Sequence, residues 1–203
     1  SGMGRPRCDP SAMCRQLWHT PLATMRTRTS PGPGSSTSTR RIIMHQAIAA
    51  DLTNRLVNAY QQVPLGDPLA AGTLMGPLVT GTAVAAMHRA LEQAVREGGQ
   101  ILTGGQPRPD LGPYFYEPTV LTGVTSEMTC FANETFGPVV AIQVVENEAE
   151  AVAAANATEF GLNASIFSGS RRRARALAEQ IDAGSVNIHE GYRRSRGSVD
   201  APM

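Results

Sequence analysis

The chain has 203 residues, a formal net charge of +1 and a hydrophobic content of 41%, which suits one sizeable buried core in an ordinary globular protein. No apolar run is long enough to cross a bilayer, and the N-terminus lacks the charged-then-apolar pattern of a secretory signal. All 18 lysine-or-arginine positions are arginine, so a mechanism that needs a lysine, such as a Schiff base, is excluded.

Residues 1–35 differ in composition from the rest of the chain. They are rich in Arg, Pro, Ser, Thr and Gly, hold a single acidic residue, Asp9, and show no helical or alternating period. Such a segment buries too little apolar surface to offset its chain entropy, so we expect it to be disordered, or to come from a shifted reading frame. Its arginines are scattered with almost no aromatic residues between them, so we expect no nucleic-acid partner.

Residues 36–203 alternate between strand and helix patterns and form the predicted domain. The helices repeat apolar residues at i, i+3 and i+4, as at Val84, Met87, Leu91 and Val95. Predicted helices are 47–63, 80–97, 148–156 and 171–183, and predicted strands are 42–45, 100–103, 114–121, 139–145, 164–167 and 184–188. Strands separated by helices predict an α/β fold with a parallel sheet flanked by helices.

Three cysteines, Cys8, Cys14 and Cys130, make an odd count without metal-ligand spacing. This favours a reducing, cytoplasmic compartment and predicts no metal site. Cys130 is the one thiol within residues 36–203, and we interpret it as a small buried hydrophobic residue.

The motif with the clearest chemistry is Asn-Glu-Thr-Phe-Gly-Pro-Val-Val at 133–140. The Glu134 carboxylate can accept both hydroxyls of a ribose, and the Phe136 ring can lie against a flat heterocycle. Residues two apart in an extended segment point the same way, and Gly137-Pro138 then turns the chain into the predicted strand. The alternatives are a solvated loop carboxylate for Glu134 and plain core packing for Phe136.

This motif resembles the Glu-(Thr/Ile)-Phe-Gly-Pro signature of the NAD(P)-dependent aldehyde dehydrogenases. Further blocks follow in that family's order: Ser38–His45, Gly-Asp-Pro at 66–68, Met-Gly-Pro-Leu at 75–78, the paired glycines within 98–105, Tyr-Glu-Pro-Thr-Val-Leu at 116–121, and the segments 161–167 and 183–188. The tail, 187–203, is most similar to the succinate-semialdehyde dehydrogenase branch.

The resemblance implies most of an aldehyde dehydrogenase catalytic domain over residues 36–203, truncated at its C-terminus. It implies oxidation of an aldehyde, such as succinic semialdehyde, to the carboxylic acid with NAD or NADP as cofactor. Glu134 and Phe136 would be cofactor-binding, and His189, where the family commonly has Asn, would contact the small aldehyde substrate. The full-length parent would be a homo-oligomer without a membrane or nucleic-acid partner.

The departures from the family pattern concern the chemistry itself. The position of the family's catalytic cysteine is taken by Ser36, and a hydroxyl is a far weaker nucleophile than a thiolate. The family's Glu-x-Gly-Gly segment, which carries the general base, and its dinucleotide-binding domain are not recognisable. We therefore expect the chain alone to be inactive. The alternative function is that of a catalytically inactive fragment acting as a binding or interaction module.

Overall fold

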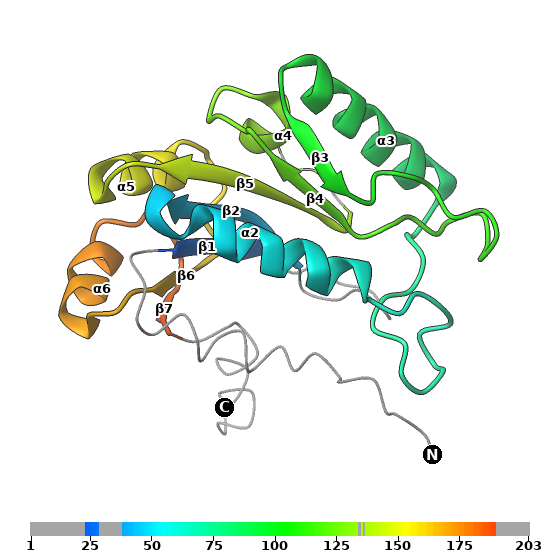
Figure 1. Ribbon diagram of the computed structural model, residues 1–203, viewed down its shortest axis with the longest axis horizontal. Helices are drawn as coiled ribbons and strands as arrows, with labels where there is room; N and C mark the ends of the chain where they lie inside the picture. Colours follow the sequence, from blue (N-terminus) through cyan, green and yellow to red (C-terminus); the bar gives the residue numbers. More distant parts are fainter. Residues whose placement is uncertain (1–22, 29–37, 134, 136, 190–203) are drawn as a thin grey trace.

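The computed structural model describes residues 23–28, 38–133, 135 and 137–189. The strands are β1 Ala23–Arg28, β2 Ser38–His45, β3 Gln100–Thr103, β4 Thr119–Thr122, β5 Val139–Val145, β6 Asn163–Phe167 and β7 Val186–Ile188. The helices are α2 Gln46–Gln61, α3 Gly81–Arg96, α4 Thr129–Ala132, α5 Glu148–Asn156 and α6 Arg171–Ala178. Within these residues the strands form one seven-stranded sheet in the order β3-β4-β5-β2-β1-β6-β7 (Figure 1).

The sheet is mixed but mostly parallel. β2 pairs in parallel with β5, β5 with β4, and β6 with β7, whereas β1 is antiparallel to both β2 and β6 and β3 is antiparallel to β4. Five strands therefore run one way, and β1 and β3 run the other. The predicted α/β class, with helices flanking a largely parallel sheet, is confirmed.

The two faces of the sheet carry different helices. Alternate residues of β2 point to opposite faces: Ile42 and Met44 pack in a cluster with Leu52 of α2, while Ile43 packs in a cluster with residues of α5 and α6. Helix α2 thus covers one face, and α5 and α6 cover the other (Figure 1). A third cluster, with Met87 of α3 and Val139 of β5, lies beneath α3.

Both long helices are capped by a polar side chain just before their first residue. The Nδ1 atom of His45 accepts a hydrogen bond from the backbone N–H of Ala47, and the Oγ1 atom of Thr80 accepts one from that of Ala83, each at 3.1 Å. Val95, which the apolar repeat groups with Met87 and Leu91, is not buried with them: its exposed fraction is 49%, and Ala94 is fully buried instead. The chain folds back at this turn, where the backbone N–H of Gly99 donates to the Ala94 carbonyl.

Further elements differ from prediction. The predicted strand 114–121 begins only at Thr119, as β4, and the short helix α4 was not predicted. Helix α6 ends at Ala178 rather than at 183, although Ile181 beyond it is still buried. Strand β1 lies within the segment for which the sequence indicated no regular element. A strand between two neighbours is held by backbone hydrogen bonds on both sides. Because these bonds do not involve side chains, they produce no repeating pattern of apolar residues in the sequence. The proposed boundary between residues 35 and 36 lies outside the described residues and stays a prediction.

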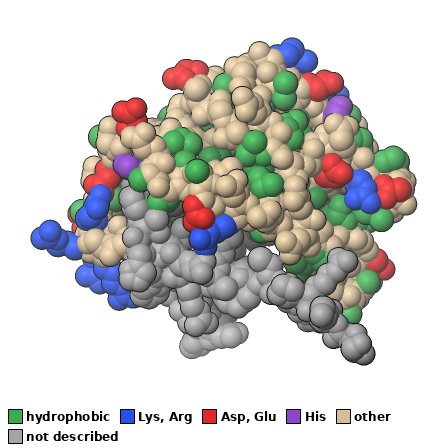
Figure 2. All heavy atoms as spheres, viewed as in Figure 1, with side chains coloured by type: hydrophobic (Ala, Val, Ile, Leu, Met, Phe, Trp, Pro, Cys, Tyr) green, Lys and Arg blue, Asp and Glu red, His purple; other side chains and the backbone are tan. Residues whose placement is uncertain are grey.

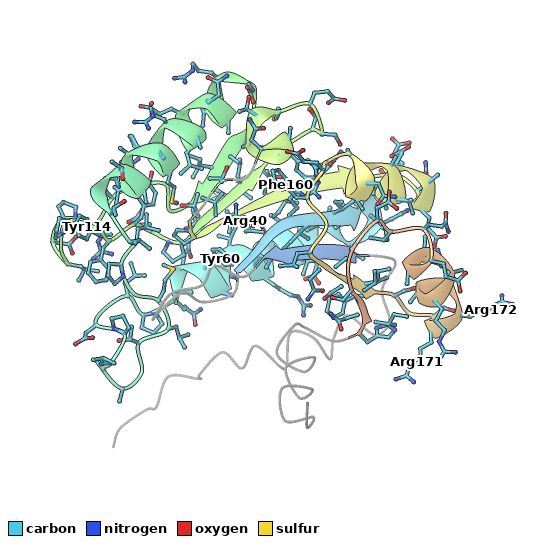
Figure 3. All side chains as sticks on the ribbon, turned by 180° about the vertical axis from the view of Figure 1, so that it is seen from behind. Arg40, Tyr60, Tyr114, Phe160, Arg171 and Arg172 are labelled. Carbon is cyan, nitrogen blue, oxygen red and sulfur yellow. The ribbon has the colours of Figure 1, made fainter. Side chains whose placement is uncertain are left out.

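The face of the molecule that Figure 2 shows carries a cluster of like charge. Basic side chains cluster over α6, whereas elsewhere on the visible face acidic and basic groups are mixed (Figure 2). Arg171 and Arg172 extend away from the fold (Figure 3), and the Nε atom of Arg173 donates to Glu148 at 2.8 Å. No helix in the described part of the chain is long and apolar enough to span a membrane. The same part holds no group of three or more His, Cys, Asp or Glu placed to hold a metal ion.

Candidate functional site

A cavity of about 300 Å³ lies at the edge of the sheet where β2, β5 and β6 begin. Its lining comes from the first residues of these strands, from α4 and from the segments that precede β5 and β6. The lining residues are Arg40, Arg41, Cys130, Phe131, Asn133, Thr135, Val139, Ala141, Glu159, Phe160, Gly161, Leu162 and Asn163. Figure 3 labels Arg40, on β2, and Phe160, on the segment before β6.

One wall of the cavity includes Asn133 and Thr135, which belong to residues 133–138, here called the signature loop. The backbone N–H of Asn133 donates to the Thr129 carbonyl at 2.9 Å, which ties the loop's start to α4. The Pro138 carbonyl accepts from the backbone N–H of Thr119 at 2.7 Å, which ties its end to β4. Between these anchors, the Arg40 guanidinium donates to the Thr135 carbonyl. The predicted site residues Glu134 and Phe136 lie outside the described residues, as does Ser36.

Gly137 is required where the signature loop turns toward β5. Its φ is +153°, a value that side chains rarely allow. A Cβ atom at this position would also clash with the sulfur of Met87 on α3. The glycine of the Gly-Pro pair therefore allows the signature loop to pack closely against α3.

The opposite wall is held by Arg41, whose side chain is only 7% exposed. Its guanidinium donates to the carbonyl oxygens of Ala154 and Ala155 at 3.3 Å and to Oγ1 of Thr158 at 3.1 Å. These carbonyls belong to the last turn of α5, the end of a helix that favours a positive charge. The guanidinium carbon also lies 4.6 Å from the centroid of the Phe131 ring, within cation–π range.

The cavity combines apolar surface with buried amide groups. Phe131, Phe160 and Leu162 supply carbon surface, and Asn163 is 3% exposed. The Oδ1 atom of Asn163 accepts from Nδ2 of Asn187 at 3.0 Å, while its own Nδ2 has no partner among the described residues. This nitrogen has almost no surface exposed to the cavity or to solvent.

Cys130 lines the cavity, but its environment keeps the thiol protonated. Burial, and to a lesser extent the Glu97 carboxylate, raise the pKa of the Cys130 thiol to about 11. Since the thiolate is the nucleophilic form, this group is nearly inert at neutral pH. The structure thus agrees with the interpretation of Cys130 as a small packing residue.

His189 lies at the other end of the strands from the cavity. Through β1, Met44 near the end of β2 is in register with Phe167 at the end of β6, and His189 follows β7 at this edge. The two edges are about four residues, or roughly 13 Å, apart along the strands. The His189 ring meets Phe167 edge-on at 6.4 Å, and burial, then the charge of Arg171, lower the pKa of its imidazole. His189 and the signature loop are therefore not brought together.

Comparison with known proteins gives the family. The sequence model of the aldehyde dehydrogenase family matches residues 34–200, which is most of the chain. The chain belongs to the aldehyde dehydrogenase family. The resemblance that the motifs indicated is thereby confirmed.

Named relatives agree with this assignment. A Mycolicibacterium smegmatis protein provisionally named succinate-semialdehyde dehydrogenase [NADP(+)] is 44% identical over 82% of this chain and 32% of its own length. The succinate semialdehyde dehydrogenase [NAD(P)+] of Escherichia coli is 37% identical over 79% of this chain and 34% of its own length. Betaine aldehyde dehydrogenase of Staphylococcus aureus, solved in complex with NAD+, superposes with a TM-score of 0.72 at 31% identity, covering 75% of this chain and 31% of that one. The chain thus spans about a third of the length of these dehydrogenases.

Several residues of this aldehyde dehydrogenase cavity were not among the predicted site residues. Arg40, Arg41, Phe160 and Asn163 were treated as parts of strands or connecting segments. The Gly-Leu-Asn run at 161–163 was recognised as a family block, yet only the fold brings it beside the signature loop. The Arg40-Arg41 pair could have been recognised from the sequence. Two arginines at the start of an apolar strand need polar partners once that strand is buried.

Proposed function

We propose that residues 36–203 form the cofactor-side wall of an NAD(P)-dependent aldehyde dehydrogenase. The complete enzyme would oxidise a small aldehyde, with succinic semialdehyde as the first candidate, to the carboxylic acid. The observation that carries the proposal is the family match over residues 34–200. Two relatives named for succinate semialdehyde support the substrate class, and the names leave the cofactor as NAD or NADP.

The cavity fits one part of such a cofactor. Pockets for small molecules commonly measure about 300–1,000 Å³, so a cavity of about 300 Å³ suits one moiety of a dinucleotide rather than the whole. Its aromatic and aliphatic walls, which include Phe160 and Leu162, suit a flat ring. When bound, the nicotinamide supplies the hydride acceptor of the reaction.

We assign two roles to the signature loop. Glu134 accepts hydrogen bonds from the ribose hydroxyls, and Phe136 lies against the nicotinamide. Support comes from the family match, because the model of the aldehyde dehydrogenase family covers the whole motif at 133–140. The role of the loop is to orient the cofactor and to exclude water, so it acts on binding and positioning rather than on proton transfer.

This chain does not supply the nucleophile of the covalent step. Ser36 takes the position of the family cysteine, and a serine hydroxyl without a neighbouring base attacks aldehydes poorly. Cys130 is held as a thiol by its raised pKa of about 11. The predicted substrate contact of His189 stays a prediction, and its place at the far edge of the sheet lends it no support.

The test is a substitution in a fusion protein. Residues 37–203 are joined behind the part of the Mycolicibacterium smegmatis relative that precedes the matched region, with a cysteine at the position of Ser36. In this fusion, Glu134→Gln removes a charged acceptor, and a hydrogen bond to a charged group contributes about 1.5–3 kcal/mol. We expect kcat or cofactor affinity to fall by roughly 10- to 100-fold, with little change in Tm.

The matched control is Glu146→Gln, at an exposed carboxylate just after β5. It should leave NAD(P)H formation and Tm near those of the unsubstituted fusion. If Glu134→Gln and Glu146→Gln have equally small effects on turnover and cofactor affinity, Glu134 does not bind the cofactor.

A further inference from the structure

We propose that Arg40 is a positioning residue that holds the signature loop in its cofactor-binding conformation. The inference rests on the proposed function, because it assigns a bracing role to a loop that we propose binds the ribose and the nicotinamide. Its starting point is the contact between the Arg40 guanidinium and the Thr135 carbonyl. These residues are 95 positions apart in the sequence.

The contact between Arg40 and Thr135 is made in the middle of the loop, between its two anchored ends. The loop's ends are tied by backbone hydrogen bonds, at Asn133 to α4 and at Pro138 to β4. Thr135 lies midway between these ties and directly between the two residues that we assign to the cofactor. A bond to its carbonyl therefore limits how far the backbone at Thr135 can rotate.

Arg40 is attached to a rigid base. It belongs to β2, whose next residue, Arg41, pairs in parallel with Ala141 of β5. The signature loop runs directly into β5, so the distance from Arg40 to the loop is set by the register of two neighbouring strands. A hydrogen bond from a charged guanidinium is also about twice as strong as one between neutral groups.

The neighbouring residue, Arg41, holds the opposite wall of the cavity. Arg41 binds the carbonyls of Ala154 and Ala155 and the hydroxyl of Thr158, just before the segment that forms the opposite wall of the cavity. Two consecutive residues of one strand thus brace two facing walls. Arg41 is buried and Arg40 is half-buried, so we expect Arg41 to support the fold and Arg40 to support the loop.

The experiment measures amide hydrogen exchange by mass spectrometry on the full chain without any cofactor. In Arg40→Ala we expect the peptide covering 133–138 to exchange about ten-fold faster or more, while peptides from β5 and α5 are unchanged and Tm stays close to that of the unsubstituted chain. Arg40→Lys, which keeps a cation with a donor, should recover part of the lost protection. The matched control is Arg55→Ala, which removes an exposed arginine paired with Asp51 on α2 and should leave the loop as it was.

Unchanged exchange of the loop in Arg40→Ala would overturn the inference. So would equal exchange in Arg40→Lys and Arg40→Ala, because the loop would then not depend on the hydrogen bond. General acceleration in every peptide would also overturn it, because Arg40 would then be a residue of the fold. The proposed function is tested separately, since the Glu134 assay leaves Arg40 in place and the exchange experiment contains no cofactor. If Glu134→Gln has no effect but Arg40→Ala speeds exchange of the loop, the cofactor role of the loop is refuted, whereas its bracing by Arg40 stands.

Discussion

Arg41 places its guanidinium at the end of α5, on the Phe131 ring and among backbone carbonyl oxygens. The negative end of the helix dipole and the aromatic face both favour a cation, which offsets the cost of burying the charge. The contact ties the start of β2 to the end of α5 across 113 positions of sequence. The Arg41 side chain therefore joins strand β2 to helix α5.

Replacing Arg41 with Met should keep the packing volume but leave the carbonyls of Ala154 and Ala155 without their donor. We expect the free energy of unfolding to fall by about 2–3 kcal/mol, since each buried acceptor left unpaired costs about 1–3 kcal/mol. Urea unfolding of the full chain measures this. Arg55→Ala, at an exposed pair on α2, should cost less than about 1 kcal/mol. Equal losses for the two variants would mean that Arg41 contributes no more than a surface arginine.

At the residue scale, the sequence predicted local chemistry and missed contacts made at long range. The carboxylate and the ring of the signature loop stand out because they lie two positions apart in a recognisable motif. The contacts of Arg40 and Arg41 join residues that are 95 and 113 positions apart, and no local pattern encodes such a pairing. Asn163 was missed for the same reason, because its amide lines a cavity only after β6 is placed.

At the scale of elements, Glu97 links α3 to α4. Its carboxylate accepts hydrogen bonds from Oγ1 of Thr129 at 2.6 Å, from the backbone N–H of Thr129 at 2.8 Å and from Nε2 of Gln93 at 2.8 Å. These bonds, with the Thr129 side chain contributing most, lower the pKa of the Glu97 carboxyl from its ordinary value of 4.5. The carboxylate in effect caps the short helix from which the signature loop departs.

The pH dependence of this link has a definite sign. Because the folded state lowers the pKa of Glu97, its stabilising contribution is present above about pH 4.5 and is lost as the pH falls through the lower, folded pKa. Glu97→Gln should therefore lower Tm at pH 7 by about 2 °C, and the difference from the unsubstituted chain should shrink below pH 4.5. Thermal unfolding followed by circular dichroism at pH 7 and at pH 3.5–4 checks this.

The control for Glu97 is Glu92→Gln on the same helix, where Oε1 of Glu92 lies 3.7 Å from Nε2 of His88 and half of its side chain is exposed. Its effect at pH 7 should be the smaller of the two. A Glu97→Gln variant with an unchanged Tm at pH 7, or with a deficit that grows in acid, would show that the carboxylate does not hold α4 in place.

The elements themselves were predicted to the extent that one face of each is buried. Helices α2 and α3 were found from their 3.6-residue apolar period, and strand β5 from a run of apolar residues. The predictions were wrong at positions where the repeat of apolar residues does not determine burial or strand formation. Val95 lies in the last turn of a helix, where the chain folds back, and β1 is defined by its neighbours' backbones rather than by its own pattern.

At the scale of the whole molecule, strand and helix order predicted the class of fold. Alternation of strands and helices led to a sheet in which five of seven described strands run in one direction. The cavity was not predicted as a unit, because it depends on three strand ends meeting at one edge. The same geometry separates His189 from the signature loop, which a linear motif could not have revealed.

We propose that residues 36–203 provide the cofactor-side wall of an aldehyde dehydrogenase whose nucleophile this chain does not carry. The most direct measurement is the rate of NAD(P)H formation from succinic semialdehyde by the fusion with a cysteine at position 36, beside the same fusion with Ser36 and the chain by itself. We expect turnover by the cysteine fusion, a rate at least about a thousand-fold lower with Ser36, and none from the chain. A folded cysteine fusion that forms no NAD(P)H, or turnover by the chain by itself, would contradict the account.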